Sequence, residues 1–207
     1  MDKITVTRTT TESKMEVVLD FSPLKSDYRT KIKTPLIFLN HMIEHIAWRS
    51  GINIETSIAL DEFALTHVVC EDLGIAFGKA VLEYVTRNTA EGMKGYADAY
   101  GIIDEARAHS LISFESRSYF DIEYASGKPA AEVEGMYSED LETFLLGFVQ
   151  GANCTLQIVL EKGENGHHIW EAVFRSLGTA LGEAIKINPE LKGRTAGVAG
   201  AINWEIK

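Results

Sequence analysis

The chain has 207 residues, of which 45% are hydrophobic and 24% are charged, and it contains 17 glycines and 4 prolines. This composition excludes a disordered, collagen-like or coiled-coil protein and is typical of a globular domain with its own core. The formal net charge of −10 also argues against a general nucleic-acid-binding protein, because an acidic surface repels the phosphate backbone.

The first residues and the two cysteines indicate where the protein works. The N-terminal segment lacks the apolar stretch of a signal peptide, and no run approaches the roughly 18 apolar residues of a membrane span. We therefore expect a cytoplasmic protein without a membrane partner. Cys70 and Cys154 form no CxxC pair, so they are predicted to be buried free thiols.

Apolar periodicity predicts strands and helices along the whole chain. Residues 4–21 alternate in polarity around a polar centre, which predicts a β-hairpin with Glu12 at its turn. Thr34 and Pro35 are a helix-start signal, and apolar residues then recur at helical spacing until Gly51. The remaining predicted elements are strands at 52–60, within 96–124 and at 154–161, and helices from Thr66, over 140–152 and over 167–187.

The chain contains an internal repeat with an offset of 100 residues. Segment 53–83 aligns with segment 153–183 without a gap, and each copy is predicted to hold a strand, a loop and a helix. The residues that recur 100 positions later are Asn53, Ile58, Leu60, His67, Glu71, Gly78, Ala80 and Glu83. Two copies of this length predict two similar half-domains, 1–93 and 94–187, that share one core in a single domain spanning 1–207.

Both copies of the repeat place a histidine and a glutamate four residues apart at a helix start. His67 and Glu71, and likewise His167 and Glu171, project from one helix face a turn apart, so each pair can bind one ion. His168 points about 100° away from His167 around the helix, which assigns it to a different site. Imidazole and carboxylate ligands without thiolates suit Mn, Fe, Zn or Ni. The repeat therefore predicts divalent metal sites.

A structural alternative explains the same residues without a metal. One histidine–glutamate pair at this spacing is usually a surface contact worth a few tenths of a kcal/mol, and histidines also satisfy buried polar groups in oligomers. Recurrence of the pair at equivalent positions favours the metal interpretation. His41 and His45 form a further pair at this spacing, but His45 and His109 fit ordinary polar-face histidines better.

Two longer motifs carry a resemblance to a known family. They are FLNHMIEHIA at residues 38–47 and HHIWEAVF at residues 167–174. The shorter matches are R-x-T-x-E at 8–12, E-D at 71–72, D-E-A at 104–106 and S-R at 116–117. With these motifs the chain resembles the imidazoleglycerol-phosphate dehydratases of histidine biosynthesis. The resemblance implies an α+β fold in which duplicated half-domains form two four-stranded sheets around four helices, similar to the second domain of a small-subunit ribosomal protein.

The resemblance also implies up to two manganese ions per chain, each held in the family by three histidines and one glutamate. The six matching ligands are divided between two sites, His41, His167 and Glu171 in the first and His67, Glu71 and His168 in the second. The remaining histidine of each site is replaced, by Val68 in the first and by Thr143 in the second. Two histidines and one carboxylate can still hold a divalent ion, so we expect binding that is weaker.

Positions that bind substrate in the family are altered more strongly. The resemblance assigns Glu12 and Arg117 to substrate binding. Arg49 stands where the family has a histidine, and Gly95 stands where it has an arginine. The segment 195–201, around Ala199, lacks a lysine and a hydroxyl residue that the family has there. Each charge-assisted hydrogen bond to phosphate is worth about 1.5–3 kcal/mol, so phosphate binding weakens unless Arg49, Lys94 or backbone amides replace those donors.

The activity that the resemblance implies is metal-dependent dehydration of D-erythro-imidazole-glycerol phosphate to imidazole-acetol phosphate, a hydro-lyase reaction. The metals would act as Lewis acids that hold the substrate's imidazole, Glu171 or Glu71 would move protons, and Glu12 would complete the pocket. The family forms a 24-subunit shell with active sites between subunits, so we expect a homo-oligomer. The alternative is a diverged paralogue that keeps the scaffold and metal sites but acts on another substrate or is not catalytic.

Overall fold

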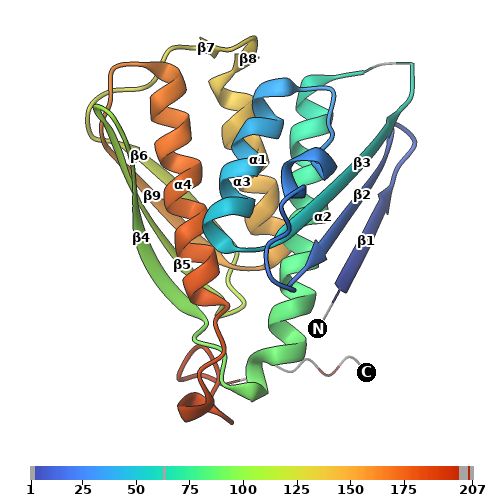
Figure 1. Ribbon diagram of the computed structural model, residues 1–207, viewed down its shortest axis with the longest axis vertical. Coiled ribbons are helices and arrows are strands. Elements are labelled where there is room, and N and C mark those ends of the chain that lie inside the picture. Colours follow the sequence, from blue (N-terminus) through green and yellow to red (C-terminus); the bar gives the residue numbers. More distant parts are fainter. Residues whose placement is uncertain (1–2, 63, 201–204, 206–207) are drawn as a thin grey trace.

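The computed structural model describes residues 3–62, 64–200 and 205 of the chain (Figure 1). The helices within these residues are α1 (Ile37–Ser50), α2 (Thr66–Asn88), α3 (Ser138–Ala152) and α4 (Gly166–Ala184), with short 3-10 helices η1 (Tyr28–Lys31), η2 (Thr89–Glu91) and η3 (Pro189–Leu191). The strands are β1 (Lys3–Thr9), β2 (Ser13–Asp20), β3 (Asn53–Leu60), β4 (Tyr96–Ile103), β5 (Ala106–Ser113), β6 (Tyr119–Tyr124), β7 (Glu132–Val133), β8 (Met136–Tyr137) and β9 (Thr155–Lys162).

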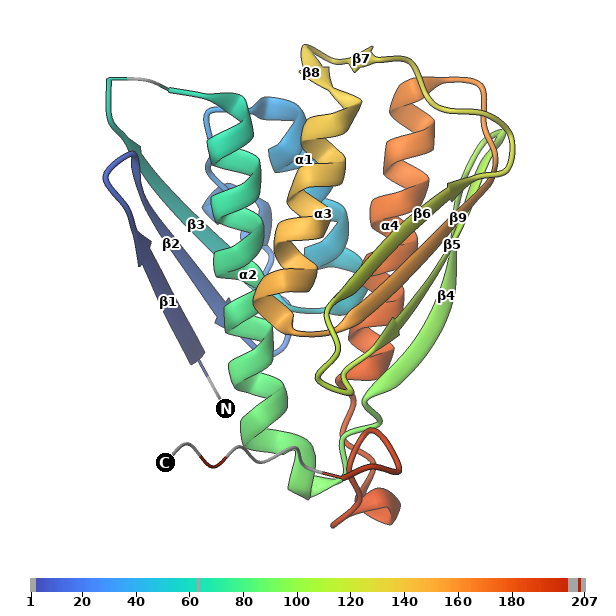
Figure 2. The same cartoon turned by 180° about the vertical axis from the view of Figure 1, so that it is seen from behind.

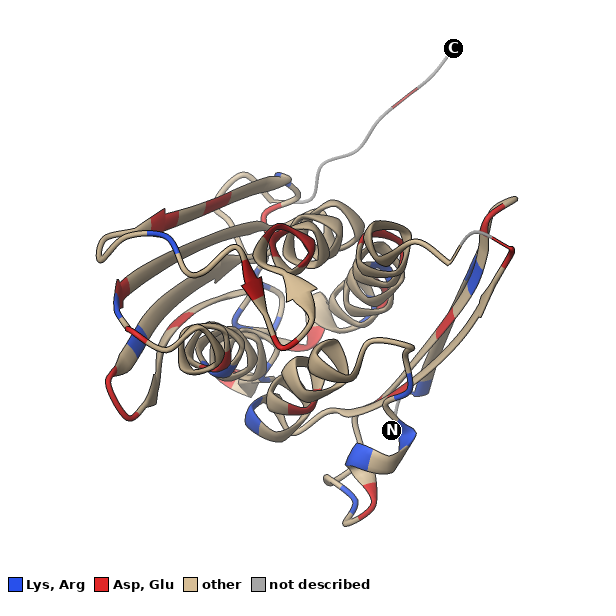
Figure 3. Cartoon of the chain, turned by 90° about the horizontal axis from the view of Figure 1, so that it is seen from above, with Lys and Arg blue, Asp and Glu red and all other residues tan. Residues whose placement is uncertain are grey.

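Two β-sheets enclose the layer of helices (Figure 1, Figure 3). Strands β1, β2 and β3 form an antiparallel sheet in that order, and α2 packs against it. The other sheet has the order β4-β5-β9-β6, with β6 parallel to β9, and α4 packs against it. Between the sheets, α1 packs on α4 and α2 packs on α3. The predicted α+β fold, with helices between two sheets, is confirmed.

The N-terminal sheet differs from the prediction of four strands, because three strands are present among the described residues. The segment between β2 and α1 lies along β3, where a fourth strand would pair, but it is attached through side chains. The buried Asn53 side chain accepts a hydrogen bond from the backbone N–H of Lys25 at 2.8 Å. Thr56 Oγ1 accepts from the N–H of Lys33 at 2.7 Å and donates to its carbonyl at 3.0 Å. These contacts replace the backbone ladder of a strand.

Large apolar side chains fill the space between the layers. The largest of those that are fully buried are Trp170, Phe144, Phe148 and Phe174. Cys70 and Cys154 are free and buried, as predicted, and burial raises the pKa of the Cys154 thiol to about 12, which keeps it protonated. None of the helices that the structure describes is long and apolar enough to cross a membrane.

All of the long helices begin at the same end of the molecule, close to the β7-β8 ribbon (Figure 2). Helices α2 and α4 start at Thr66 and Gly166, which matches the offset of the sequence repeat. Each follows a strand, β3 in one case and β9 in the other. The repeated histidine–glutamate pairs therefore occupy equivalent helix starts at one end of the helix layer.

Helices α1 and α4 approach each other closely at two glycines of α4. A Cβ atom at Gly178 would lie 2.9 Å from the Cα of Ile46, and one at Gly182 would lie 2.8 Å from the Cα of Ser50. Real Cβ atoms essentially never come this close to other heavy atoms. Glycine at these two positions therefore sets the distance between the helices that carry His41 and His167.

Candidate metal centre

The start of α4 is fixed by an asparagine cap. The side-chain oxygen of Asn165 accepts hydrogen bonds from the backbone N–H groups of His167 at 2.8 Å and His168 at 3.3 Å. This capping satisfies two of the free N–H groups at the helix end and places both histidines in its first turn. One turn later Glu171 lies on the same face as His167, and only 4% of the glutamate is exposed.

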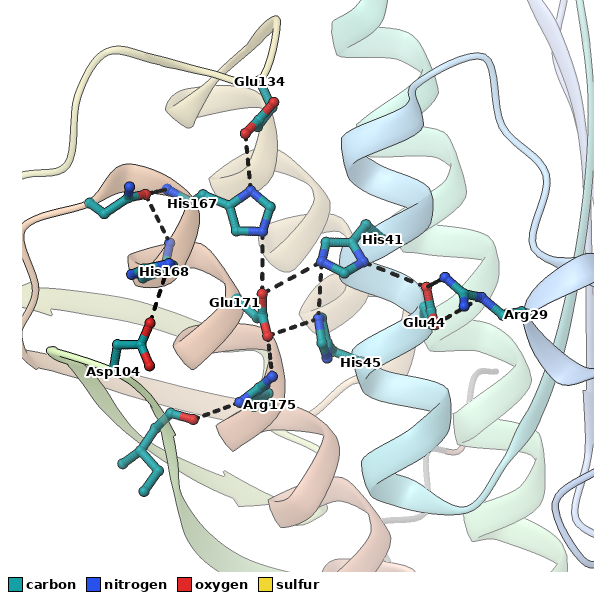
Figure 4. A network of polar contacts seen from close by, with 12 residues as sticks. Arg29, His41, Glu44, His45, Asp104, Glu134, His167, His168, Glu171 and Arg175 are labelled. Carbon is teal, nitrogen blue, oxygen red and sulfur yellow. Dashed lines mark hydrogen bonds and ion pairs between the residues drawn. The ribbon is translucent and has the colours of Figure 1, made fainter. Parts of the chain in front are cut away.

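The chain enters α1 through a similar local arrangement. Thr34 Oγ1 accepts from the N–H of Leu36 at 3.0 Å, and the side-chain oxygen of Asn40 accepts from the N–H of Thr34 at 2.8 Å. The predicted start signal therefore lies just before the helix, which begins at Ile37. His41 and His45 follow on the face of α1 that is directed at Glu171 (Figure 4).

The Glu171 carboxylate lies at the centre of the polar network between the two helices (Figure 4). Its Oε2 is 3.5 Å from His41 Nε2 and 3.3 Å from His167 Nε2. Its Oε1 is 3.3 Å from His45 Nε2 and forms an ion pair with the guanidinium of Arg175. The Nε2 atoms of His41 and His45 are themselves 3.3 Å apart. Three imidazole nitrogens and a buried carboxylate thus meet at one point.

Two outer carboxylates orient two of these imidazole rings. His167 Nδ1 is 3.1 Å from Glu134 Oε1, and His41 Nδ1 is 3.5 Å from Glu44 Oε2. Glu44 is in turn 3.1 Å from the guanidinium of Arg29. A carboxylate at Nδ1 favours a proton on that nitrogen and leaves the Nε2 lone pair free to face the cluster. This is the usual arrangement around histidines that ligate metals.

The charges in the cluster determine which protonation states are present. Burial raises the pKa of Glu171, but the nearby His45, Arg175, His41 and His167 outweigh it, so the net pKa lies below its ordinary value. Burial lowers the pKa of His45 to about 4, although the Glu171 carboxylate opposes that shift. At neutral pH the cluster therefore contains an ionised carboxylate and a neutral His45, the forms that bind a cation.

The donor atoms fit a divalent ion. Ligand atoms of His41, His167 and Glu171 lie within 4.8 Å of one another, and among the described residues no other such group of three is found. Four ligands about 2.1 Å from an ion are about 3.4 Å from each other, close to the 3.3 and 3.5 Å measured from Glu171 Oε2 to the two imidazoles. Nitrogen and carboxylate donors without thiolates match Mn, Fe, Zn or Ni. The first predicted ligand set is therefore assembled within one chain.

His168 points away from this cluster toward the loop between β4 and β5. Its Nδ1 is 2.8 Å from Glu105 Oε2, and its Nε2 is 3.8 Å from Asp104 Oδ2. The hydrogen bond to Glu105 raises the pKa of His168. The backbone N–H of Asn165 and the side chain of His168 together lower the pKa of Glu105 to about 2. His168 is thus held by carboxylates in the same way as His167.

Within one chain, the second predicted ligand set is not brought together. His67 is exposed at the start of α2. Burial raises the pKa of Asp140 on α3, and the nearby His67 acts in the opposite direction. Glu71 is half-buried one turn later, and Val68 is half-buried beside His67. Thr143 Oγ1 donates to a backbone oxygen of its own helix one turn earlier, at 2.8 Å. A second site at His67, Glu71 and His168 stays a prediction.

Glu12 lies at the exposed turn of the β1-β2 hairpin, as predicted. The neighbouring Ser13 donates from Oγ to Asp72 Oδ2 of α2 at 2.5 Å, and Arg8 forms an ion pair with the same carboxylate. Asp72 is 4% exposed. This buried link attaches the hairpin to the helix that carries His67, so the position of Glu12 depends on α2.

Arg49 is exposed on the last turn of α1 and lines a small cavity beside the cluster. The cavity has a volume of about 240 Å³, and its walls include His45, Arg175, Trp48 and Tyr28. Arg175 also donates from Nη1 to the Ile102 carbonyl at 2.8 Å, which fixes the direction of its guanidinium. Two arginines therefore face a space that opens next to Glu171.

Arg117 lies at the opposite end of the helix layer, in the loop between β5 and β6 (Figure 1). It lines a cavity of about 270 Å³ together with Glu115 and with residues 195–197, 199 and 200. Gly95 has a φ of +71°, and a Cβ there would lie 2.3 Å from the Cβ of Ala196. The contact with the C-terminal segment thus explains why a glycine occupies this position. The structure places Arg117 with that segment and apart from the histidine cluster.

Sequence reasoning missed the contribution of His45 and Arg175. The side chain of His45 is 14% exposed and lies within the cluster, instead of on a solvated polar face. Its spacing from His41, which equals that of His167 and Glu171, was the available signal. Arg175 lies one further turn along α4 from Glu171, and this spacing of glutamate and arginine typically indicates an ion pair. Glu134 gave no signal, because its contact with His167 depends on the tertiary fold, whereas Glu44 lies three residues after His41 on the same helix and this spacing was an available signal.

Comparisons with known proteins identify the family. The family model described as imidazoleglycerol-phosphate dehydratase (IGPD) matches residues 34–181. A relative with this name from Geobacillus thermodenitrificans is 32% identical, over 91% of this chain and 93% of the relative's length. Another, from Ralstonia pickettii, is 33% identical, over 95% of this chain and 97% of the relative's length. A crystal structure of IGPD from Pyrococcus furiosus has a TM-score of 0.78 and 28% identity, covering 95% of this chain and 99% of that one. The chain belongs to the imidazoleglycerol-phosphate dehydratase family.

Proposed function

We propose that this protein is a metal-dependent hydro-lyase that dehydrates D-erythro-imidazole-glycerol phosphate in histidine biosynthesis. Family membership supports the reaction class, because the relatives carry the name of that dehydratase. The observation that carries the proposal is the cluster of His41, His167 and Glu171, whose donor atoms lie within 4.8 Å of one another. A buried carboxylate surrounded by imidazoles is suited to holding a divalent ion.

One divalent ion, manganese by analogy with the family, would be held by His41, His167 and Glu171. The second would be held by His67, Glu71 and His168, with the two helix starts supplied by neighbouring copies of the chain. Bound metal supplies Lewis acidity toward the substrate's imidazole. The chain itself supplies the ionised Glu171 carboxylate, and the outer carboxylates Glu134 and Glu44 keep the imidazole rings oriented.

The remaining site residues complete the proposal. Glu171 and Glu71 would move protons, and Glu12 would act from the hairpin turn as a catalytic and substrate-binding group. Arg49 and Arg117 would bind the charged part of the substrate. Arg49 supports this role through its position beside the cluster, since it lines the cavity next to His45.

An assembly of several copies is part of the same proposal. Arg117 belongs to the loop between β5 and β6, and the cluster lies at the start of α4; this loop and this helix start are at opposite ends of the helix layer (Figure 1). A helix of the length of α2, 23 residues, extends about 34 Å, which is far longer than a small phosphorylated substrate. Arg117 of one copy would therefore serve the cluster of another, in a homo-oligomer that reaches 24 subunits in the family, and the protein would act in the cytoplasm.

The proposal is tested by measuring conversion of the phosphorylated substrate to imidazole-acetol phosphate with purified protein and Mn²⁺. We expect turnover that stops when the metal is chelated and that Glu171→Ala abolishes. Glu183→Ala is the matched control, because Glu183 lies on the same helix and is 42% exposed at its side chain. Metal binding without turnover would refute the dehydratase function and indicate the diverged paralogue.

A further inference from the structure

We propose that Arg175 is a positioning residue that holds one carboxylate oxygen of Glu171, Oε1, and so leaves the other, Oε2, to bind the metal. This inference rests on the proposed function and deepens it, because it says how the cluster presents its carboxylate to an ion. Arg175 lies one turn after Glu171 on α4 and acts through the glutamate without touching the ion.

The two oxygens of the Glu171 carboxylate have different surroundings, which is the first step. Oε2 lies 3.5 Å from His41 Nε2 and 3.3 Å from His167 Nε2, beside the two imidazoles of the candidate ligand group. Oε1 forms the ion pair with Arg175 and lies 3.3 Å from His45 Nε2 (Figure 4). The carboxylate therefore has one oxygen on the side of the ligands and the other on the side of the guanidinium.

The guanidinium of Arg175 is fixed from two elements, which is the second step. Its Nη1 donates to the Ile102 carbonyl of β4 at 2.8 Å, and its Nη2 pairs with Glu171 Oε1 on α4. Its Nε is buried without a hydrogen-bond partner in the described part of the chain. A guanidinium is planar and its N–H groups form a rigid fork, so these two contacts set its orientation. Because the side chain of Glu171 is only 6% exposed, little water is available to replace the ion pair if the carboxylate rotates.

The charge of Arg175 distinguishes this role from a purely electrostatic one. A guanidinium close to the site repels a bound cation, so charge alone predicts that removing it strengthens Mn²⁺ binding. Positioning predicts the opposite, because a carboxylate that is free to rotate no longer holds Oε2 beside the imidazoles of His41 and His167. Groups that orient a metal ligand typically contribute about 10–100-fold to metal affinity. The two explanations therefore differ in the sign of the effect.

The test measures metal binding and not turnover. Metal-free wild type, Arg175→Gln, Arg175→Lys and the control Arg87→Gln are titrated with Mn²⁺. We expect the affinity to fall at least about tenfold in Arg175→Gln, which has neither the charge nor the fork, and by less in Arg175→Lys, which keeps the charge on a single atom. Arg87→Gln should stay within about twofold of wild type, because Arg87 pairs with Glu83 at the same spacing on α2 but its side chain is 50% exposed. Thermal unfolding without metal establishes that each variant is folded.

A crystal structure of the wild-type protein with Mn²⁺ gives a second readout, which a role in stability alone would not determine. We expect one oxygen of Glu171, Oε2, on the ion and the other still paired with Arg175. An ion bound by both oxygens, or an Arg175 side chain that has left Oε1, would overturn the inference even if the variants bind Mn²⁺ weakly.

The titration also separates this inference from the proposed function. If wild type binds no Mn²⁺, the metal-dependent function fails together with the role of Arg175. If wild type binds Mn²⁺ and either folded Arg175 variant binds it as tightly or more tightly, Arg175 does not position Glu171, and the His41, His167 and Glu171 site remains.

Discussion

The substitution Gly178→Ala tests whether the contact between α1 and α4 determines the geometry of the metal site. A Cβ at this position would lie 2.9 Å from Ile46 Cα, 3.0 Å from Arg49 Cβ and 3.0 Å from the His45 carbonyl oxygen. Ordinary contacts begin at 3.4 Å, so the helices have to separate by about 0.5 Å. Two of these atoms are backbone, which cannot move aside as a side-chain tip can.

The size of the effect follows from two opposing terms. Overpacking of this kind costs about 1–3 kcal/mol, while alanine in place of glycine favours the helix by about 0.8–1 kcal/mol. Because the contacts are with backbone, we take the overpacking cost at the upper end of its range, about 3 kcal/mol. Subtracting the helix gain of about 1 kcal/mol leaves an expected net loss of about 2 kcal/mol in the free energy of unfolding. For a chain of this size that lowers the Tm by roughly 4–8 °C. Metal ligands tolerate displacements of about 0.2 Å, so the affinity for Mn²⁺ should fall at least tenfold.

Thermal unfolding and Mn²⁺ titration of the same samples measure both effects. Thr179→Ala is the control, because it removes atoms from the adjacent position of α4, where Thr179 Oγ1 donates to a backbone oxygen of that helix at 2.9 Å. We expect its Mn²⁺ affinity to stay within twofold of wild type. A Gly178→Ala protein with a lowered Tm but unchanged affinity would refute the argument that this crossing sets the ligand distances.

Three other expectations can be measured on the same protein. Free Mn²⁺ at 100 times its Kd should raise the free energy of unfolding by about 2.7 kcal/mol and the Tm by roughly 5–10 °C, and a chelator should reverse both. Asp72→Ala should lower the free energy of unfolding, measured with urea, by about 2–3 kcal/mol. This is less than the loss of a fully buried ion pair, because the side chain of Arg8 is 29% exposed. Asp72→Asn should lower it by less than Asp72→Ala. In metal-free protein, His168 should titrate above 6.5 by NMR, and Glu105→Gln should lower its pKa. The His168–Glu105 pair should stabilise the fold most between about pH 4.5 and 6.5. Below this window Glu105 loses its contribution as the pH falls toward its lowered pKa of about 2. Above it His168 loses its contribution as the pH rises through its raised pKa.

The helices and most of the strands could be predicted because their signals are local. Apolar spacing and the 100-residue repeat indicated helix starts near Thr66 and 167, and these agree with α2 and α4. The fourth strand of the N-terminal sheet could not be predicted correctly. Whether the segment after β2 pairs through its backbone or through Asn53 and Thr56 depends on which side chains reach it in the folded chain.

The candidate cluster of His41, His167 and Glu171 could be predicted only in part, because some of its signals are local and others are not. Spacing alone placed His167 and Glu171 on one helix face, but the role of His45 depends on which face of α1 meets α4. That orientation is a tertiary property, set by close packing at Gly178. The sequence therefore predicted the residues of each chelating pair better than it predicted which pairs combine.

Equivalent positions in the repeat acquire different surroundings when the halves pack together. The pair on α4 faces α1, where His41 and His45 add two imidazoles. The corresponding pair on α2, His67 and Glu71, belongs to a helix that packs on α3, whose Thr143 hydroxyl is bound within its own helix. One copy of the motif therefore has further imidazoles beside it inside the chain, whereas the further ligands of the other, in the function that we propose, would come from another molecule. This difference follows from the order of the helices and would persist even if the two motifs were identical in sequence.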